Sequence, residues 1–464
     1  MQSICSTSTS PQPSSGFSVV FPERILSYAC GLQLFASWQH LQLGHPSKRS
    51  TSYRPEQRII ALLATLASGL KGIAPSNTFL RPNSAIKAWL DGRFPDQGTI
   101  HRWLSQTTDT QAAALRSHLH QTVHEHGRFW QVLWSRHYLF VDVDGQGLVA
   151  RGQRFEHAKD GWLGDGIDHG YQRYVCYAAD TREVLDEFLA SGNKTLMSQM
   201  PQLLSGLDAV IPRKYRHRVV VRGDSHMGTI GNIRDIRTHG YHYLCPLQSW
   251  SAIKRLREKV CHRRGGWFMD QDSKKNVARV QFWVVPRWLL SGKGRSRKVV
   301  VRATVYCRYE ANGKREWTVL VSDLKREKGV RLWQRYHERG GTIEEYNDQA
   351  ERAYHLEVIR TSCFAGLNAL HGLIAVCWNL TQWALEGLKL PPKQSPQAEP
   401  AKWQEALKND LEGLQERAAH SGLRLDRSKR GAVLEVQDTA QSVESAIWYR
   451  WLQQPIQLRL PLTG

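Results

Sequence analysis

Three consecutive valines, Val219 to Val221, constrain the fold of this chain more than any other feature of its sequence. β-Branched residues favour strands, and a strand without polar alternation is buried on both faces of its sheet. Such a sheet needs helices on both sides. A helical segment follows at residues 228–240, and another strand-like run follows at residues 241–247. The sequence therefore predicts an α/β layer architecture.

A second strand pattern begins at residue 137, in the segment HYLFVDVDG. Its side chains alternate, so that Val141 and Val143 fall on one face and Asp142 and Asp144 on the other. Residues 173–179 predict a further strand, and residues 183–211 predict one or two helices. Strands alternating with helices fit the same architecture.

Residues 251–330 do not continue this alternation of strands and helices, because they contain three strand-like runs with no helix between them. They predict a separate β-rich insertion, which is also the most basic part of the chain and includes KGRSRK at 293–298. Helices resume at about residue 331. The apolar run at 363–385 contains Asn368 and His371, which are costly at bilayer depth, so it predicts a buried helix of a soluble core and no membrane span.

The charge balance points to a polyanionic partner. Lys and Arg total 63 against 42 Asp and Glu, a formal net charge of +21. With ordinary hydrophobic content, this predicts a folded protein that binds nucleic acid. Eight cysteines without a Cys-x-x-Cys pair exclude zinc-ribbon spacing and favour reduced thiols in the cytoplasm. The first residues lack a signal-peptide pattern and predict a disordered lead-in.

Two aspartates stand at the ends of strand patterns, where chemistry is often placed. Asp144 precedes Gly145, and Asp224 follows the valine strand. Each alone could form a turn or an ion pair, for example with Arg222. Together with Glu344 from a later helix they form a set of three carboxylates, which suits a two-metal phosphoryl-transfer site with Mg²⁺ or Mn²⁺.

The segment YHERGGTIEE, residues 336–345, resembles the Tyr-Arg-Glu signature of DDE transposases of bacterial insertion sequences. The resemblance covers about residues 90–385 and rests on the order of the motifs. It implies a ribonuclease-H-like mixed sheet flanked by helices and interrupted by the β-rich insertion, with a helical N-terminal DNA-binding region. It also implies Asp144, Asp224 and Glu344 as catalytic metal ligands, and contacts to DNA from Tyr336 and Arg339.

The chain departs from the signature in two places. Four residues separate Arg339 from Glu344, where the family has three, and Glu351 stands where the family has lysine. Arg352 is the candidate replacement for that lysine as a DNA contact. Two choices of ligand stay open, Asp142 against Asp144 and Glu344 against Glu345.

The expected activity is metal-dependent cleavage and strand transfer at the terminal inverted repeats of an insertion sequence, by a homodimer in the bacterial cytoplasm, associated with the nucleoid. The alternatives are a ribonuclease-H-like nuclease without strand transfer and an inactive, transposase-derived DNA-binding protein. The segment around Thr99 could be a DNA-reading helix or one helix of a bundle. The expected divisions are a disordered lead-in (1–23), a helical DNA-binding region (24–130), the first part of the catalytic domain (131–250), the basic insertion (251–330), the last part of the catalytic domain (331–388), and a linker with a charged helical tail (389–464).

Overall fold

The computed structural model of this chain divides into two compact units. One contains Met1–Ala112 with Gln349–Leu460, and the other contains Ala113–Asp348 with Pro461–Gly464. The residues that the structure describes are 17–45, 52–135, 137–150, 152, 154–164, 166–271, 277–291, 298–309, 314–356, 358, 361–386, 388, 410–427, 434–438 and 443–456. Residues 1–16 of the expected lead-in, the linker at 389–402 and most of the KGRSRK segment lie outside this set.

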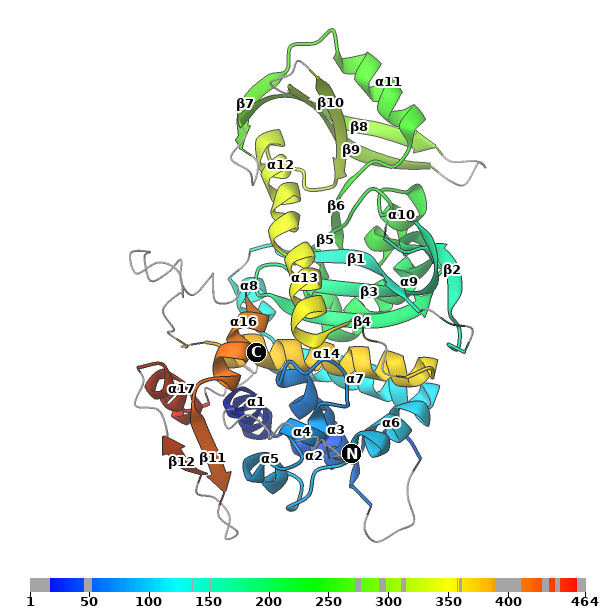
Figure 1. The fold of residues 1–464 in the computed structure, drawn as a ribbon. Helices are drawn as coiled ribbons and strands as arrows, with labels where there is room; N and C mark the ends of the chain where they lie inside the picture. Colours follow the sequence, from blue (N-terminus) through cyan, green and yellow to red (C-terminus); the bar gives the residue numbers. More distant parts are fainter. Residues whose placement is uncertain are drawn as a thin grey trace, which may run out of the picture. The chain divides into compact units, whose positions relative to one another are not determined.

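A ten-stranded mixed sheet forms the centre of the second unit (Figure 1). Its order is β2-β3-β1-β5-β6-β10-β9-β8-β7, and β4 also pairs with β3. β1 is parallel to β5, and β5 is parallel to β6, whereas β3 and β10 run antiparallel to their neighbours. The strands are β1 (Leu139–Val149), β2 (Lys159–Trp162), β3 (Ile167–Ala178), β4 (Glu183–Ser191), β5 (Val219–Arg222), β6 (His242–Pro246), β7 (Gly266–Gln271), β8 (Val277–Ser291), β9 (Lys298–Tyr309) and β10 (Arg315–Ser322). The expected α/β architecture with a mixed sheet is confirmed.

The basic β-rich insertion does not form a sheet of its own, because its strands extend the central sheet. Its last strand, β10, pairs with β6 through Ser322 and Leu244. The hydrophobic cluster on one face runs without a break from Phe140 of β1 to Tyr306 of β9. Burying this shared apolar surface favours one continuous sheet over two.

The prediction of helix from residue 183 was wrong for its first part, since Glu183–Ser191 is β4. Leucine, alanine and glutamate favour a helix in isolation. Here the acids are buried and paired across the unit: Asp186 accepts from Arg116 and His120, and Glu187 accepts from Arg173. These tertiary contacts, which local sequence does not encode, override the propensity.

Helices cover both faces of the central strands. α9 (Leu196–Val210) packs on β3 and β4, on the face where the Cys176 thiol reaches the carbonyl of Leu203. The opposite face, which carries Asp142, Asp144 and their register partners, meets α13 (Ile343–Tyr354), where Tyr346 stacks on Tyr177 with ring centroids 5.1 Å apart. The remaining elements are α7 (Asp109–His126), whose first residues belong to the other unit, α8 (Phe129–Trp134), η1 (Arg213–Arg218), α10 (Ile230–Thr238), α11 (Trp250–Val260), α12 (Gly329–His337) and η2 (Glu338–Gly341).

The first unit is mainly helical, and its core is α14 (Phe364–Ala384). This helix is long and apolar enough to cross a membrane, but 89% of its most apolar window is buried inside the structure. It packs against α1, α3 and α6, so the prediction of a buried core helix is confirmed. The other elements are α1 (Val20–Gly31), α2 (Leu34–Trp38), α3 (Pro55–Ala67), α4 (Ser76–Phe79), α5 (Ser84–Ala88), α6 (Gln97–Ser105), α16 (Leu411–Ala419), the hairpin β11 (Leu423–Arg427) with β12 (Leu434–Asp438), and α17 (Val443–Gln453).

Candidate active site

Asp142 is fully buried, and both of its oxygens are occupied. The Arg222 guanidinium donates to Oδ1 at 2.7 Å and to Oδ2 at 2.9 Å, and the Thr342 hydroxyl donates to Oδ2 at 2.5 Å. The two partners in the sheet are register neighbours, because Asp142 of β1 lies opposite Arg222 of β5. A bidentate pair of this kind is strong and specific in orientation. Asp142 therefore fixes β1, β5 and the start of α13 together.

Asp144 lies two residues further along β1, past the end of the pairing with β5. β1 continues beside β3 to Val149. Asp144 therefore lies inside the strand, whereas the sequence predicted that it lies at the end of the strand. Its Oδ1 accepts from Arg339 at 2.8 Å and its Oδ2 from Asn347 at 3.1 Å. Burial and the charge of Asp224 raise the pKa of Asp144, and Arg339 partly offsets this rise. A carboxylate that is destabilised by its surroundings in this way favours a cation beside it.

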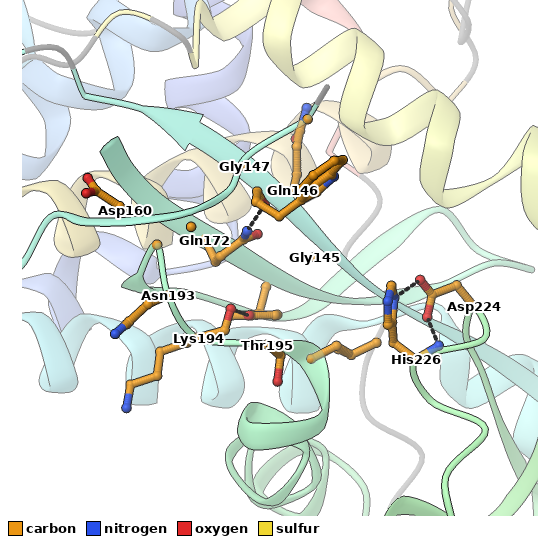
Figure 2. A pocket seen from close by; sticks show the side chains of 16 residues that line it. Gly145, Gln146, Gly147, Asp160, Gln172, Asn193, Lys194, Thr195, Asp224 and His226 are labelled. Carbon is orange, nitrogen blue, oxygen red and sulfur yellow. Dashed lines mark hydrogen bonds and ion pairs between the residues drawn. The ribbon is translucent and has the colours of Figure 1, made fainter. Parts of the chain in front are cut away.

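Asp224 lies in the turn after β5, on the open side of the site. Its side chain is 36% exposed, and it accepts from the backbone N–H of His226 and contacts the His226 ring, both at 2.9 Å (Figure 2). Its charge raises the pKa of Asp144 and also contributes, after burial and Arg339, to the shifted pKa of Tyr336. The structure thus places Asp224 within electrostatic reach of Asp144, as the sequence predicted from strand order.

Glu344 lies in the first turn of α13 with its side chain 62% exposed, and its Oε1 is 3.8 Å from Nη1 of Arg339. Glu345 instead faces Arg182, with 3.6 Å between charged atoms. The extra residue between Arg339 and Glu344 falls where the 3₁₀ turn η2 gives way to α13, and Thr342 at this junction has irregular backbone angles. Of the two adjacent glutamates, Glu344 is the one that shares a partner with Asp144.

Arg339 connects the first and third acids. It is only 8% exposed, and it contacts both Asp144 and Glu344. Burial lowers the pKa of Arg339, but Asp144, Asp142 and neighbouring acidic groups more than offset this, and the net shift is upward. Burial also raises the pKa of Tyr336 to about 12, so its phenol stays protonated in the physiological range.

Three further residues hold the site, and the sequence reading missed them. Asn347 donates to Asp144 and accepts from Arg173 at 2.9 Å, while Arg173 forms a bidentate pair with Glu187. Thr342 joins Asp142, as described above. The sequence could have indicated Asn347, because it lies one helical turn after Glu344 on α13 and so on the same face of the helix. The alternation of residues in a strand does not show in the same way that an arginine such as Arg173 is buried beside the site.

Arg352 is an exposed residue in the last turn of α13, and it belongs to the helical unit. The sequence proposed it as a DNA contact, and this stays a prediction.

The chemistry of the acids fits a hard divalent ion, since carboxylate oxygens are the ligands that Mg²⁺ and Mn²⁺ prefer. Asp144 and Asp224 are electrostatically coupled, and Asp144 shares a cationic partner with Glu344. Among the residues that the structure describes, no three His, Cys, Asp or Glu side chains are grouped closely enough to hold a metal ion. The three acids are thus of the right chemical kind for such a cation, and in this arrangement the Arg339 guanidinium stands between Asp144 and Glu344.

The mixed sheet carries an acid on its first strand, an acid after the parallel neighbour and a glutamate on a late helix, which is the arrangement that the resemblance to DDE transposases implies. The family described as "Transposase DDE domain" matches residues 135–380, more than half of the chain. The chain belongs to this family and is a DDE-class transposase. Proteins of the family act on DNA and generally use divalent metals.

Among solved structures, the chain is similar to a piggyBac transposase in a synaptic complex with hairpin DNA. The two share 13% identity, with a TM-score of 0.40, over 87% of this chain and 80% of the other. No curated protein matches the sequence.

Proposed function

We propose that this transposase cleaves DNA at the ends of an insertion sequence and joins the freed 3′ ends to target DNA. The observation that carries the proposal is the linked set of acids: Asp224 raises the pKa of Asp144, and Asp144 and Glu344 share Arg339. Three carboxylates from separate elements of one unit suit phosphoryl transfer better than structural pairing, because Asp144 and Glu344 keep exposed surface instead of being fully neutralised.

Asp144, Asp224 and Glu344 would hold Mg²⁺ or Mn²⁺. A bound pair of such ions activates the attacking oxygen and stabilises the leaving oxygen of the phosphodiester. Arg339 donates to one oxygen of Asp144 and Asn347 to the other, so the Asp144 carboxylate is held in one orientation before a ligand binds. Glu344 is free to turn toward the other acids, because it is exposed and its contact with Arg339 is long.

Tyr336, Arg339 and Arg352 would meet the DNA backbone near the cleaved bond. Arg339 is mostly buried, so a phosphate would approach it from the side of the exposed Glu344. Arg352 would supply the cation that the family signature places at a lysine, and its planar guanidinium can bind a phosphate with two parallel hydrogen bonds. The strongly basic insertion and the helical N-terminal region would add contacts to the terminal repeats.

The protein would act as a homodimer that holds both element ends, in the cytoplasm of a bacterial cell and associated with the nucleoid. The net charge of +21 supports the association with DNA.

The test uses a plasmid that carries the DNA flanking the coding region, incubated with the purified protein and Mg²⁺. We expect nicking that stops when the metal is chelated and that falls at least about 100-fold in Asp224→Asn, with DNA binding nearly unchanged. Asp235→Asn, which changes an exposed aspartate on α10, is the matched control and should cut normally. Normal cutting by Asp224→Asn would remove Asp224 from the site.

The same assay separates the alternatives. Nicked products that are never joined to a second DNA would identify a nuclease without strand transfer. DNA binding without nicking in the wild-type chain would identify an inactive DNA-binding protein.

A further inference from the structure

A cavity of about 600 Å³ opens beside Asp224 in the second unit (Figure 2). Asp224 and His226 lie at one end, and Asp160, Asn193 and Lys194 lie at the other. Its volume falls in the range of sites that hold small organic ligands, roughly 300–1,000 Å³. Nothing in the proposed chemistry of the three acids uses this space.

Glycines line the cavity and allow the backbone segments around it to pack closely. A Cβ on Gly161 of β2 would overlap the carbonyl oxygen of Gly192, and a Cβ on Gly147 would overlap the backbone of Leu163. Backbone therefore packs directly on backbone, which holds β2 against the turn that follows β4. Gly145, the residue after Asp144, also lines the cavity and cannot gain a side chain without meeting the Tyr174 ring.

The rim of the cavity carries an exposed aromatic ring and an exposed ammonium group. Trp162 lines the cavity, is 67% exposed, and stacks on no other aromatic ring in the described part of the chain. The backbone of Trp162 is held in place, because the Gln172 side chain donates to its carbonyl oxygen at 2.7 Å and Trp162 pairs with Ile167 of β3. Lys194 is exposed and forms no ion pair with any residue that the structure describes.

We propose that this cavity holds one unpaired nucleotide of the DNA strand next to the reacting phosphate. The Trp162 ring would stack on the base, the Asn193 amide would hydrogen-bond its edge, and Lys194 would pair with the adjoining phosphate. Aromatic stacking tolerates any base, so such a site needs no particular sequence. A paired base cannot enter, because its edge is occupied and both its faces are stacked in the duplex. The inference rests on the proposed function, since Asp224 at the cavity's end supplies the reason for a DNA strand there.

The experiment measures binding without divalent metal, using a duplex with a short single-stranded 3′ overhang that contains 2-aminopurine. Wild-type protein should quench the fluorescence of this base. Trp162→Ala should lose the quenching and bind the overhang duplex about 5- to 100-fold more weakly. It should bind a blunt duplex as wild type does, and Trp162→Phe should retain most of the overhang affinity.

An abasic overhang separates stacking from general attraction. With the base removed, wild type and Trp162→Ala should bind equally. Trp250→Ala is the matched control, because Trp250 is 76% exposed but lies on α11 in the insertion, at the far end of the same unit from β2 (Figure 1). It should change overhang and blunt binding by the same factor.

The outcomes separate the cavity from the proposed function. Equal overhang binding by wild type and Trp162→Ala, in a protein that cleaves DNA, would overturn the cavity's assignment alone. An overhang-specific loss in a protein that never cleaves would support the assignment and contradict the proposed function.

Discussion

Two aspartates only two residues apart in β1 have opposite surroundings. Asp142 is fully buried, and its charge is neutralised by Arg222. Asp144 keeps 22% of its side chain exposed, and burial together with Asp224 raises its pKa. A neutralised carboxylate holds structure together, whereas a partly exposed one with a raised pKa is available for a ligand. The geometry therefore favours Asp144 as the ligand and Asp142 as a structural residue.

This difference predicts separate effects for the two amide variants. Asp142→Asn should lower the free energy of unfolding by about 3–5 kcal/mol, because it leaves Arg222 buried without its counter-charge. Asp144→Asn should cost much less stability and should abolish cleavage. Urea unfolding of both variants, beside the nicking assay, checks the prediction. Full stability with lost cleavage in Asp142→Asn would reverse the assignment of the two residues.

The choice between these aspartates could not be made from the sequence. Strand alternation correctly placed both on one face, and the order of the elements brought Asp224 to the same region. The deciding contact is Arg222, whose partner depends on the register between β1 and β5. The packing of the whole sheet sets the register between strands, so the register cannot be predicted from the sequence of one strand.

At the scale of elements, the turn between α12 and α13 absorbs the residue by which this chain departs from the family signature. The 3₁₀ turn η2 ends at Gly341, and Thr342 then bonds in two directions, to Asp142 at 2.5 Å and to the carbonyl of Arg339 at 2.9 Å. These bonds fix where α13 begins, and so where Glu344 stands. The extra residue thus leaves the contact between Arg339 and Glu344 intact.

Thr342 therefore offers a test of how α13 is attached. Thr342→Val keeps the shape but removes the hydroxyl, leaving Asp142 with one fewer donor, and should lower the free energy of unfolding by about 1–3 kcal/mol. Thr342→Ser keeps the hydroxyl and should stay close to wild type. Thermal unfolding of the pair gives the comparison. Equal stability of the two variants would show that the hydrogen bond contributes nothing to docking of α13.

The strand β4 shows why element type was harder to predict than element order. Its segment was predicted to be helical, but in the strand Asp186 is completely buried between Arg116 and His120. Both partners come from α7, some 70 residues earlier in the sequence. The local sequence pattern around an acid does not show that its ion-pair partner lies that far away in the chain.

At the scale of the molecule, a buried histidine links folding of the second unit to pH. His118 of α7 is buried, and burial lowers its pKa from 6.5 to about 4, with Glu125 raising it slightly. The folded state therefore binds this proton more weakly than the unfolded state does. The contribution to stability is complete above pH 6.5 and is lost as the pH falls toward 4.

Replacing His118 should accordingly flatten the acid side of the stability curve. In wild type this one group should cost up to about 3 kcal/mol between pH 6.5 and 4, at 1.36 kcal/mol for each pKa unit. His118→Gln should lose less stability over that interval, whatever its stability at neutral pH. Urea unfolding at several pH values checks this, with the exposed His262→Gln as control. Parallel curves for wild type and His118→Gln would contradict the assignment.

The excess of positive charge should act through particular surfaces rather than through the net charge alone. α11 and the turn after it carry exposed cations with Glu258 as the one acid among residues 250–264, and Lys254, Arg255 and Arg263 form no ion pair in the described part of the chain. If these three meet phosphates, each releases a counterion, and the slope of log affinity against log salt falls by about 0.9 for each contact.

The triple variant Lys254→Gln, Arg255→Gln and Arg263→Gln should therefore make that slope shallower by about 2.7 in magnitude, since three contacts are lost. A control that removes the same charge from exposed Arg213, Lys214 and Arg237, which lie outside both the insertion and the helical N-terminal region, should change the slope less. Filter binding of a blunt duplex over a range of salt concentrations measures both. Equal changes in the two variants would mean that only the net charge matters, and an unchanged slope in the first would move the DNA path away from α11.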